Sequence, residues 1–252
     1  MTGTAPTHWQ KRVRVDARRT MRRLNDVYLL TSLSTQGLLL VRDALSETKR
    51  RAMDVVVLDH AGAEKATTRR KKHIRTLLSA AIERTQVEYA LQSVVAETEA
   101  FVGSVLRHIL TAYPAKLSSG EKKIDLGIVL ESTSRDEIIS RLVETRIAST
   151  LYGSPGDYLG IVGEVVSVPM PSSLAGQFSE VKATRDLIVH AQGIANSVYI
   201  RKSGEYARVE SGLLASVDQP YLRHAVAVAR QLTSFLAKAV QDKFGETRDA
   251  ES

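Results

Sequence analysis

Arg185 and His190 are the residues whose types and spacing offer the clearest chemistry, and both lie near the end of an expected helix. A histidine has a pKa of about 6.5 and can take up and release protons at neutral pH. An arginine keeps its charge, and its forked guanidinium suits phosphate oxygens. Such a pair can cleave RNA without a metal ion, because RNA carries its own nucleophile, the 2′-OH. The alternative is a histidine favoured by the dipole at a helix C-terminus, beside a solvated arginine.

One helix cannot place both side chains on a single face, because five residues turn about 140° around the helix axis. A symmetric pair of helix ends, contributed by two copies of the chain, can bring arginine and histidine together. The interpretation as a ribonuclease site therefore requires a homodimer. DNA lacks the 2′-OH and is not expected to be cleaved.

Other common kinds of catalytic site are missing from the sequence. The chain has no Cys, which excludes a thiolate metal site and a cysteine nucleophile. Its six histidines are scattered, and no P-loop, H-E-x-x-H or G-x-S-x-G motif occurs. We therefore expect no metal site and no cofactor.

The composition and the hydrophobic periodicity predict an all-α fold. We expect a basic N-terminal helical hairpin over residues 1–62, turning at Ser34–Gly37, and a multi-helix bundle over residues 63–252. A small β-hairpin is expected within residues 206–217. The proline-free stretch from Ala63 to Tyr113 predicts either one long helix or, as we prefer, two helices with a break near Glu83–Glu88.

Capping residues set the expected bounds of the helices around Arg185. Gly193 is expected to stop the helix that carries Arg185, and Asn196 to cap a short helix that ends at Gly204. Asp218 and Pro220 are expected to start a final helix, and Ser134 with Glu137 to form a capping box farther upstream.

The run from Lys182 to Gly204 resembles the HEPN superfamily, in particular the RiboL-PSP-HEPN branch. Further parts of that pattern match the segments Phe101 to Pro114, Leu151 to Pro155 and Asp218 to Leu222. The resemblance covers about residues 85–244, and residues 1–60 have no counterpart in it. It implies an all-α domain that dimerises, and many members are metal-independent RNA endonucleases. Other members only bind RNA.

The resemblance implies that Arg185 and His190 are the catalytic residues. Asp186 stands where active members often have Asn, and a carboxylate at this position either repels the scissile phosphate or orients its neighbours. Thr184 and Glu180 are candidate supporting residues, with a cap, a packing group or a surface charge as the alternatives. Their final assignment depends on where the fold places them.

A second group of residues is expected to bind RNA. Asn196 and Tyr199 follow the arginine–histidine segment closely, although a helix cap and a packing aromatic are the simpler interpretations. The basic run Arg69, Arg70, Lys71 and Lys72 can bind phosphates without sequence preference, or it is a solvated helix face.

The positive charge is concentrated in the first third of the chain. Residues 1–75 hold 17 Lys and Arg against 7 Asp and Glu, whereas residues 76–252 hold 18 against 21. This asymmetry is typical of a surface that binds nucleic acid, an anionic membrane or an acidic partner, and a solvated arginine-rich helix is the alternative.

Three functions remain open from the sequence. The first is a HEPN ribonuclease in a stress, toxin–antitoxin or phage-defence response, with RNA, a second copy and an antitoxin or other protein as partners. The second is an inactive HEPN module that binds RNA, and the third is a helical interaction or membrane-surface protein. We expect a cytoplasmic location and no stable membrane insertion, because the uncharged stretch at residues 27–41 is too short and too polar to span a bilayer.

Overall fold

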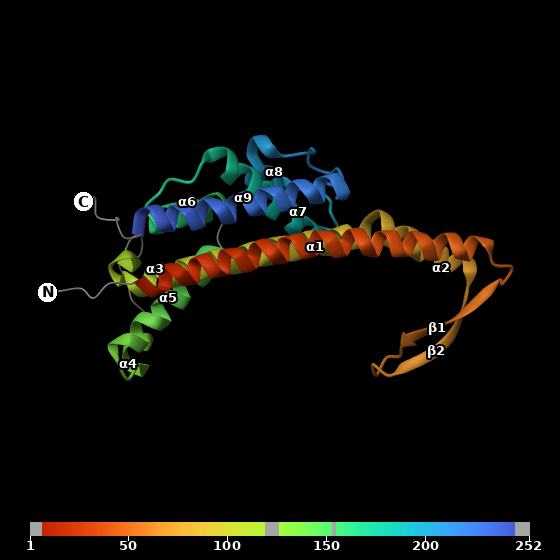
Figure 1. Ribbon diagram of the computed structural model, residues 1–252, viewed down its shortest axis with the longest axis horizontal. Coiled ribbons are helices and arrows are strands. Elements are labelled where there is room, and N and C mark those ends of the chain that lie inside the picture. The colour runs from red at the N-terminus through yellow and green to blue at the C-terminus, as the bar shows by residue number, and fades with distance from the viewer. Residues whose placement is uncertain (1–6, 119–125, 153–154, 245–252) are drawn as a thin grey trace, which may run out of the picture.

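A 41-residue helix, α1 (Thr7–Glu47), runs along the whole molecule (Figure 1). The structure is a computed structural model that describes residues 7–118, 126–152 and 155–244. The turn expected at Ser34–Gly37 is wrong, because the helix passes through it without interruption. Thr35 uses its hydroxyl to bond the carbonyl of Thr31 within the same helix (2.9 Å). An interior glycine costs a helix only about 1 kcal/mol relative to alanine, so Gly37 does not end it.

The separate second helix of the expected hairpin is wrong, because the chain continues α1 to Glu47 and then forms a β-hairpin. Strands β1 (Ala52–Leu58) and β2 (Glu64–Arg70) pair antiparallel, with Ala52 opposite Arg70. The turn is closed by Asp59, whose carboxylate accepts hydrogen bonds from the amides of Ala61 (2.8 Å) and Ala63 (2.9 Å). Valines at positions 55–57 favour a strand because their branched side chains suit a pleated surface.

The small β-hairpin therefore lies at residues 52–70, not within residues 206–217. In that later segment Leu214 forms an isolated antiparallel bridge with Ile194, which lies outside the segment. The expectation of a predominantly helical fold with a small hairpin is confirmed, whereas the position of the hairpin is corrected.

After β2 the chain is helical as far as Ala112. α2 (Lys71–Ala80) continues through a π-helical turn, η1 (Ala81–Thr85), into α3 (Gln86–Ala112). The preferred break near Glu83–Glu88 is replaced by this π-helical turn, and the 3₁₀ turn η2 (Pro114–Ser118) follows α3. The remaining elements are α4 (Leu126–Glu131), α5 (Arg135–Tyr152), α6 (Pro155–Val166), α7 (Ser172–Ala191), α8 (Ser197–Ser203), η3 (Gly204–Tyr206) and α9 (Gln219–Phe244).

The expected caps of α8 and α9 are confirmed. Asn196 accepts a hydrogen bond from the amide of Tyr199 (3.0 Å), and Asp218 accepts one from the amide of Tyr221 (2.8 Å). The capping box at α5 differs in one half. Ser134 caps the amide of Glu137 (3.2 Å), but the Glu137 carboxylate bonds Thr133 instead of reaching the amide of Ser134. Gly153 and Ser154, which belong to the HEPN-like pattern, lie outside the described residues.

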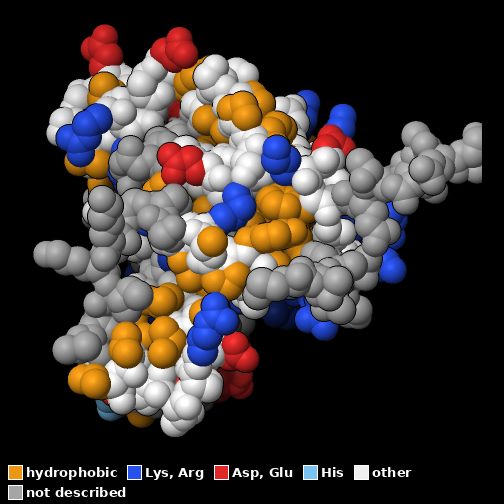
Figure 2. Space-filling view, turned by 90° about the vertical axis from the view of Figure 1, so that its left-hand side faces the viewer, with side chains coloured by type: hydrophobic (Ala, Val, Ile, Leu, Met, Phe, Trp, Pro, Cys, Tyr) orange, Lys and Arg blue, Asp and Glu red, His pale blue; other side chains and the backbone are white. Residues whose placement is uncertain are grey.

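The bundle is centred on α1, α3 and α9, which lie side by side, with α5, α6 and α7 packed around them (Figure 1). Val13, Ala17 and Leu24 of α1 are buried in the same core as the later helices, so the N-terminal segment is part of the bundle. The start of α1 and the end of α9 meet at one end of the bundle, where the rings of Trp9, Tyr113 and Phe244 pack together. Figure 2 shows this end, where hydrophobic side chains alternate with scattered Lys and Arg.

At the opposite end, residues 38–80 project from the bundle as an arm (Figure 1). The arm contains the last turns of α1, the β-hairpin and α2, and few of its side chains are buried. No helix in the described ranges has an apolar stretch long enough to cross a membrane.

Candidate functional site

Helix α7 carries most of the candidate site residues, and its end sets the position of His190. Gln192 adopts a left-handed conformation (φ 52°), and Gly193 follows with φ 82°. The amide of Gly193 donates to the carbonyl of Leu187 (2.9 Å), which closes the last turn. Gly193 therefore stops the helix as expected, and His190 lies exposed in the last turn.

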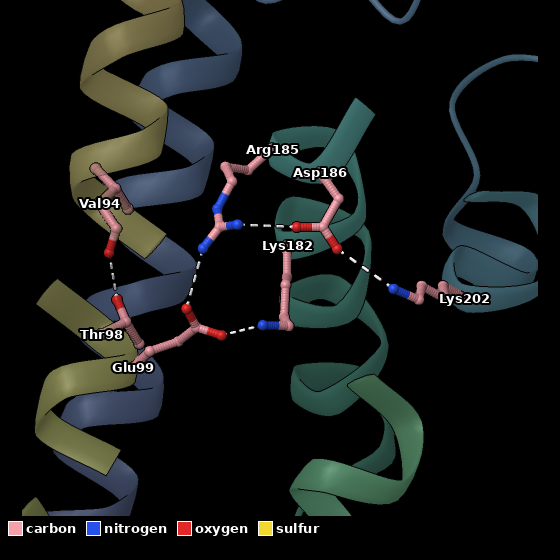
Figure 3. Close-up of polar contacts among 7 residues, drawn as sticks. All are labelled: Val94, Thr98, Glu99, Lys182, Arg185, Asp186 and Lys202. Carbon is pink, nitrogen blue, oxygen red and sulfur yellow. Dashed lines mark hydrogen bonds and ion pairs between the residues drawn. The ribbon is translucent and has the colours of Figure 1, made fainter. Parts of the chain in front are cut away.

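Arg185 points away from this end and toward α3 (Figure 3). Its guanidinium bonds the carboxylate of Glu99 (Nη2–Oε2 3.2 Å) and that of Asp186 (Nη1–Oδ1 3.0 Å). Lys182 pairs with the other oxygen of Glu99, and Lys202 pairs with the other oxygen of Asp186 (3.3 Å). The result is a chain of alternating charges from α7 to α3 on one side and to α8 on the other.

This charge chain has consequences for Arg185. Its side chain keeps 23% of its surface exposed, so it is accessible from solvent, but two carboxylates already bind the guanidinium. No pattern in the sequence indicates Glu99, which lies 86 residues before Arg185 and contacts it only because α3 packs against α7. A phosphate bound by Arg185 would have to share the guanidinium with these carboxylates or displace them.

His190 lies at a shallow hollow of about 230 Å³ between α7 and α8. Asp186, Asn196 and Lys202 line the same hollow, so the structure brings four polar side chains together there. Arg185 is not part of its lining. Arg185 and His190 thus lie on different faces of α7 within one chain, as the helix geometry predicts.

Apolar side chains are exposed around this end of α7. Val189 precedes His190 and is 46% exposed, and Val198 lines the hollow and is 41% exposed. Ile194 and Leu214 form the isolated bridge and are 42% and 47% exposed. We call these four residues the apolar rim. Such a group beside a polar hollow is typical of a surface that contacts another protein.

Glu180 is buried and forms the centre of a separate hydrogen-bond network. Its carboxylate accepts bonds from the hydroxyls of Thr184 (2.6 Å), Tyr199 (3.1 Å) and Tyr221 (2.7 Å), and from Nε of Arg208 (2.9 Å). The Arg208 guanidinium also lies 3.7 Å above the Tyr221 ring. Burial raises the pKa of Tyr221 well above its ordinary value, and burial also raises the pKa of Tyr199. The two phenols therefore stay protonated and donate to the carboxylate.

This network places three of the expected site residues in the interior of the fold. Glu180 and Thr184 are buried at 3% and 0% exposure, and they hold α7 to α8 and α9. Tyr199 is 1% exposed, so its ring cannot stack on RNA in this conformation, and the packing interpretation is the right one. Asn196 caps α8 but also lines the hollow, so both of its expected roles are compatible with its position.

The basic run lies in the arm, in a different place from His190. Arg69 and Arg70 are exposed at the end of β2, and Lys71 and Lys72 open α2. Lys71 is fixed there, because its ammonium donates to the carbonyl of Thr48 (2.7 Å). No pattern in the sequence indicates that residues 49–51 lie beside this run. The pairing of β1 with β2 places the two segments next to each other.

Comparison with known proteins gives no relative for this chain. No family model matches it, and neither a curated protein nor a solved structure does so. Among the described residues there is also no group of three or more His, Asp or Glu that could hold a metal ion. The HEPN resemblance therefore stays a prediction, which depends on residues 182–204 and on the geometry at the end of α7.

Proposed function

We propose that this protein is a metal-independent RNA endonuclease of the HEPN type, with its active site formed by two copies of the chain. His190 transfers protons, and Arg185 binds the phosphate oxygens. The observation that carries the proposal is the exposed His190, which lies at a polar hollow next to the apolar rim. A second copy that covers the rim brings its own α7 end to the first.

The proposed reaction uses the RNA itself as the nucleophile. The ribose 2′-oxygen attacks the adjacent phosphorus while its proton passes to an imidazole, and the bond from phosphorus to the 5′-oxygen breaks. An imidazolium supplies a proton to that leaving oxygen. The products are a 2′,3′-cyclic phosphate and a 5′-hydroxyl. A guanidinium stabilises the doubly charged phosphorane because its charge is fixed and forked.

The charges around Arg185 fit this proposal in one specific way. Glu99 and Asp186 hold the guanidinium in one orientation, while Lys182 and Lys202 offset their negative charge. Arg185 is thereby positioned before RNA arrives, which lowers the reorganisation needed in the transition state.

The same carboxylates favour a second candidate function, an RNA-binding module without cleavage. Asp186 and Glu99 both contact the arginine that must bind the phosphate, and each carboxylate repels a phosphate. In this second function the basic arm binds RNA and the α7 end only recruits a partner. Cleavage separates the two functions.

The biological setting belongs to the proposal as well. An RNA endonuclease can cleave the RNA of its own cell, so a stress, toxin–antitoxin or phage-defence role and a cytoplasmic location fit it. A protein partner of the antitoxin kind would act most simply by covering the apolar rim and His190.

Incubation of purified protein with labelled single-stranded RNA in excess EDTA tests the proposed function. We expect cleavage of the RNA and no cleavage of DNA with the same sequence, because only RNA has the 2′-OH. Gel electrophoresis of both substrates over the same time course measures this. Cleavage of DNA, or RNA cleavage that appears only when Mg²⁺ is added, contradicts the proposal. Salt-sensitive binding without cleavage supports the second candidate function.

A further inference from the structure

The arm contains a second hollow, of about 640 Å³, whose lining is mostly cationic. We call it the basic hollow. Two hydroxyl side chains, Thr76 and Ser79, complete its lining. The six cations around it are Lys49, Arg50, Arg51, Lys71, Lys72 and Arg75.

The fold of the arm brings two basic segments together to form the basic hollow. The amide of Lys71 donates to the carbonyl of Arg51 (2.9 Å), one step beyond the β1–β2 pairing. The Lys71 ammonium donates to the carbonyls of Ser46 (3.3 Å) and Thr48 (2.7 Å) at the end of α1. Residues 49–51 and the first turns of α2 are therefore held next to each other by hydrogen bonds from Lys71 to backbone carbonyls.

The positive charges in the basic hollow have no protein counter-charge in the described part of the chain. No carboxylate lines the hollow, and none of its six cations forms an ion pair there. The first turn of α2 contributes Lys71 and Lys72 to this lining, and it has no side-chain cap and no acidic residue. Six like charges in one hollow repel one another, and a helix N-terminus adds partial positive charge. A bound anionic ligand would reduce the repulsion among the cations and interact favourably with the helix N-terminus.

The lining also indicates which part of a ligand is recognised. The basic hollow offers ammonium, guanidinium and hydroxyl groups, and no aromatic or large apolar side chain lines it. Such groups bind phosphates and leave a nucleobase without a partner. The chemistry therefore fits the backbone of a strand better than a single nucleotide.

The root of the arm connects the basic hollow to the α7 end. Arg84, in η1, donates to the carbonyl of Gln192 (3.5 Å), two residues after His190. Arg75 lies nine residues before Arg84 on the same helical segment, which corresponds to about 14 Å along the axis. A strand of a few nucleotides spans this distance.

We propose that the basic hollow binds successive phosphates of an RNA strand whose cleavable linkage lies at His190. This inference rests on the proposed function for the position of the linkage. The hollow acts as a holding site that increases the local concentration of substrate, independently of base sequence. Its contacts involve phosphate alone, so a DNA strand binds there as well and remains uncut.

The test uses a labelled 2′-O-methyl RNA, which cannot be cleaved, and fluorescence anisotropy over a range of salt concentrations. In the full-length chain, Arg51→Gln, Lys72→Gln and Arg75→Gln are combined, because these three side chains are exposed. The bonds of Lys71 to Ser46, Thr48 and Arg51 go to backbone carbonyls, which the changes keep. We expect affinity to fall by about tenfold or more, and the slope of log K against log salt to lose about 2 units, at about 0.7 for each phosphate contact.

A matched control removes the same charge elsewhere. Lys11, Arg12 and Arg19 are exposed on the first turns of α1, far from the arm (Figure 1). The combined Lys11→Gln, Arg12→Gln and Arg19→Gln variant should keep most of the affinity and the slope. An equal loss in both variants overturns the proposal, because net charge alone then explains binding. Circular dichroism of both variants checks the fold.

Two further measurements identify the source of the phosphate and separate this inference from the proposed function. Inorganic tripolyphosphate should compete only weakly with the RNA. Tight binding of tripolyphosphate by a protein that does not bind RNA overturns the proposal. In the cleavage assay the triple variant of the basic hollow should raise KM with little change in kcat. Binding that depends on the basic hollow, without cleavage, removes the proposed function but leaves the phosphate site in place.

Discussion

Replacing His190 with alanine is expected to reduce RNA cleavage by at least about 100-fold, because the reaction loses its proton-transfer group. The side chain is exposed at the edge of a hollow, so its removal leaves the packing of α7 intact. RNA affinity, measured by anisotropy, should remain within a few-fold of the parent protein. Initial cleavage rates in EDTA measure the effect.

His60→Ala provides the matched control for this variant. His60 is an exposed histidine in the turn between β1 and β2, and this turn lies apart from α7 (Figure 1). Its replacement should leave cleavage unchanged. If His190→Ala cleaves as fast as the parent protein, the imidazole has no part in the reaction and the mechanism is wrong.

The second large effect concerns stability and not chemistry. Glu180→Ala is expected to lower the free energy of unfolding by about 3 kcal/mol or more, since it leaves buried donors without an acceptor. These donors are the hydroxyls of Tyr199 and Tyr221 and the partly buried guanidinium of Arg208. Urea denaturation followed by circular dichroism measures the change.

Two comparison variants define the cause of this loss. Glu180→Gln keeps an oxygen that accepts from the phenols, so it should cost clearly less than the alanine variant. Glu205→Ala removes an exposed carboxylate from η3 and should change stability by no more than about 0.5 kcal/mol. Equal stabilities for Glu180→Ala and Glu205→Ala would show that the buried network contributes little.

Local signals in the sequence predicted the segments around the candidate site well. Gly193, Asn196 and Asp218 act through hydrogen bonds with residues a few positions away, so their roles can be read from spacing alone. The same is true of the position of His190, which lies in the last turn of α7 as its spacing from Gly193 predicts.

The prediction for the arm is wrong in two places, the turn at Ser34–Gly37 and the helix over Val55–Val57. Ser34 and Gly37 predict a turn, but no packing contact favours a turn there, and α1 continues through these residues. The helical prediction for residues 1–62 includes Val55, Val56 and Val57, although β-branched residues before a turn that contains Asp59 and Gly62 favour a hairpin. That error also hid the basic hollow, which exists only because β1 and β2 pair.

Glu99 and Arg208 are the important residues that the sequence did not indicate. Each contacts its partner on α7 from a distant segment, Arg185 in one case and Glu180 in the other. Tertiary packing decides such pairs, and no local pattern reports them. For the same reason Tyr199 and Thr184 looked available in the sequence but belong to the core.

Analysis of the product ends tests the central claim most directly. RNA cleaved by the parent protein in EDTA is examined by mass spectrometry, with the His190→Ala protein as the blank. Attack by the 2′-OH predicts a 2′,3′-cyclic phosphate on one fragment and a 5′-hydroxyl on the other. A 3′-hydroxyl together with a 5′-phosphate would mean that water is the nucleophile, and it would contradict the Arg185–His190 mechanism.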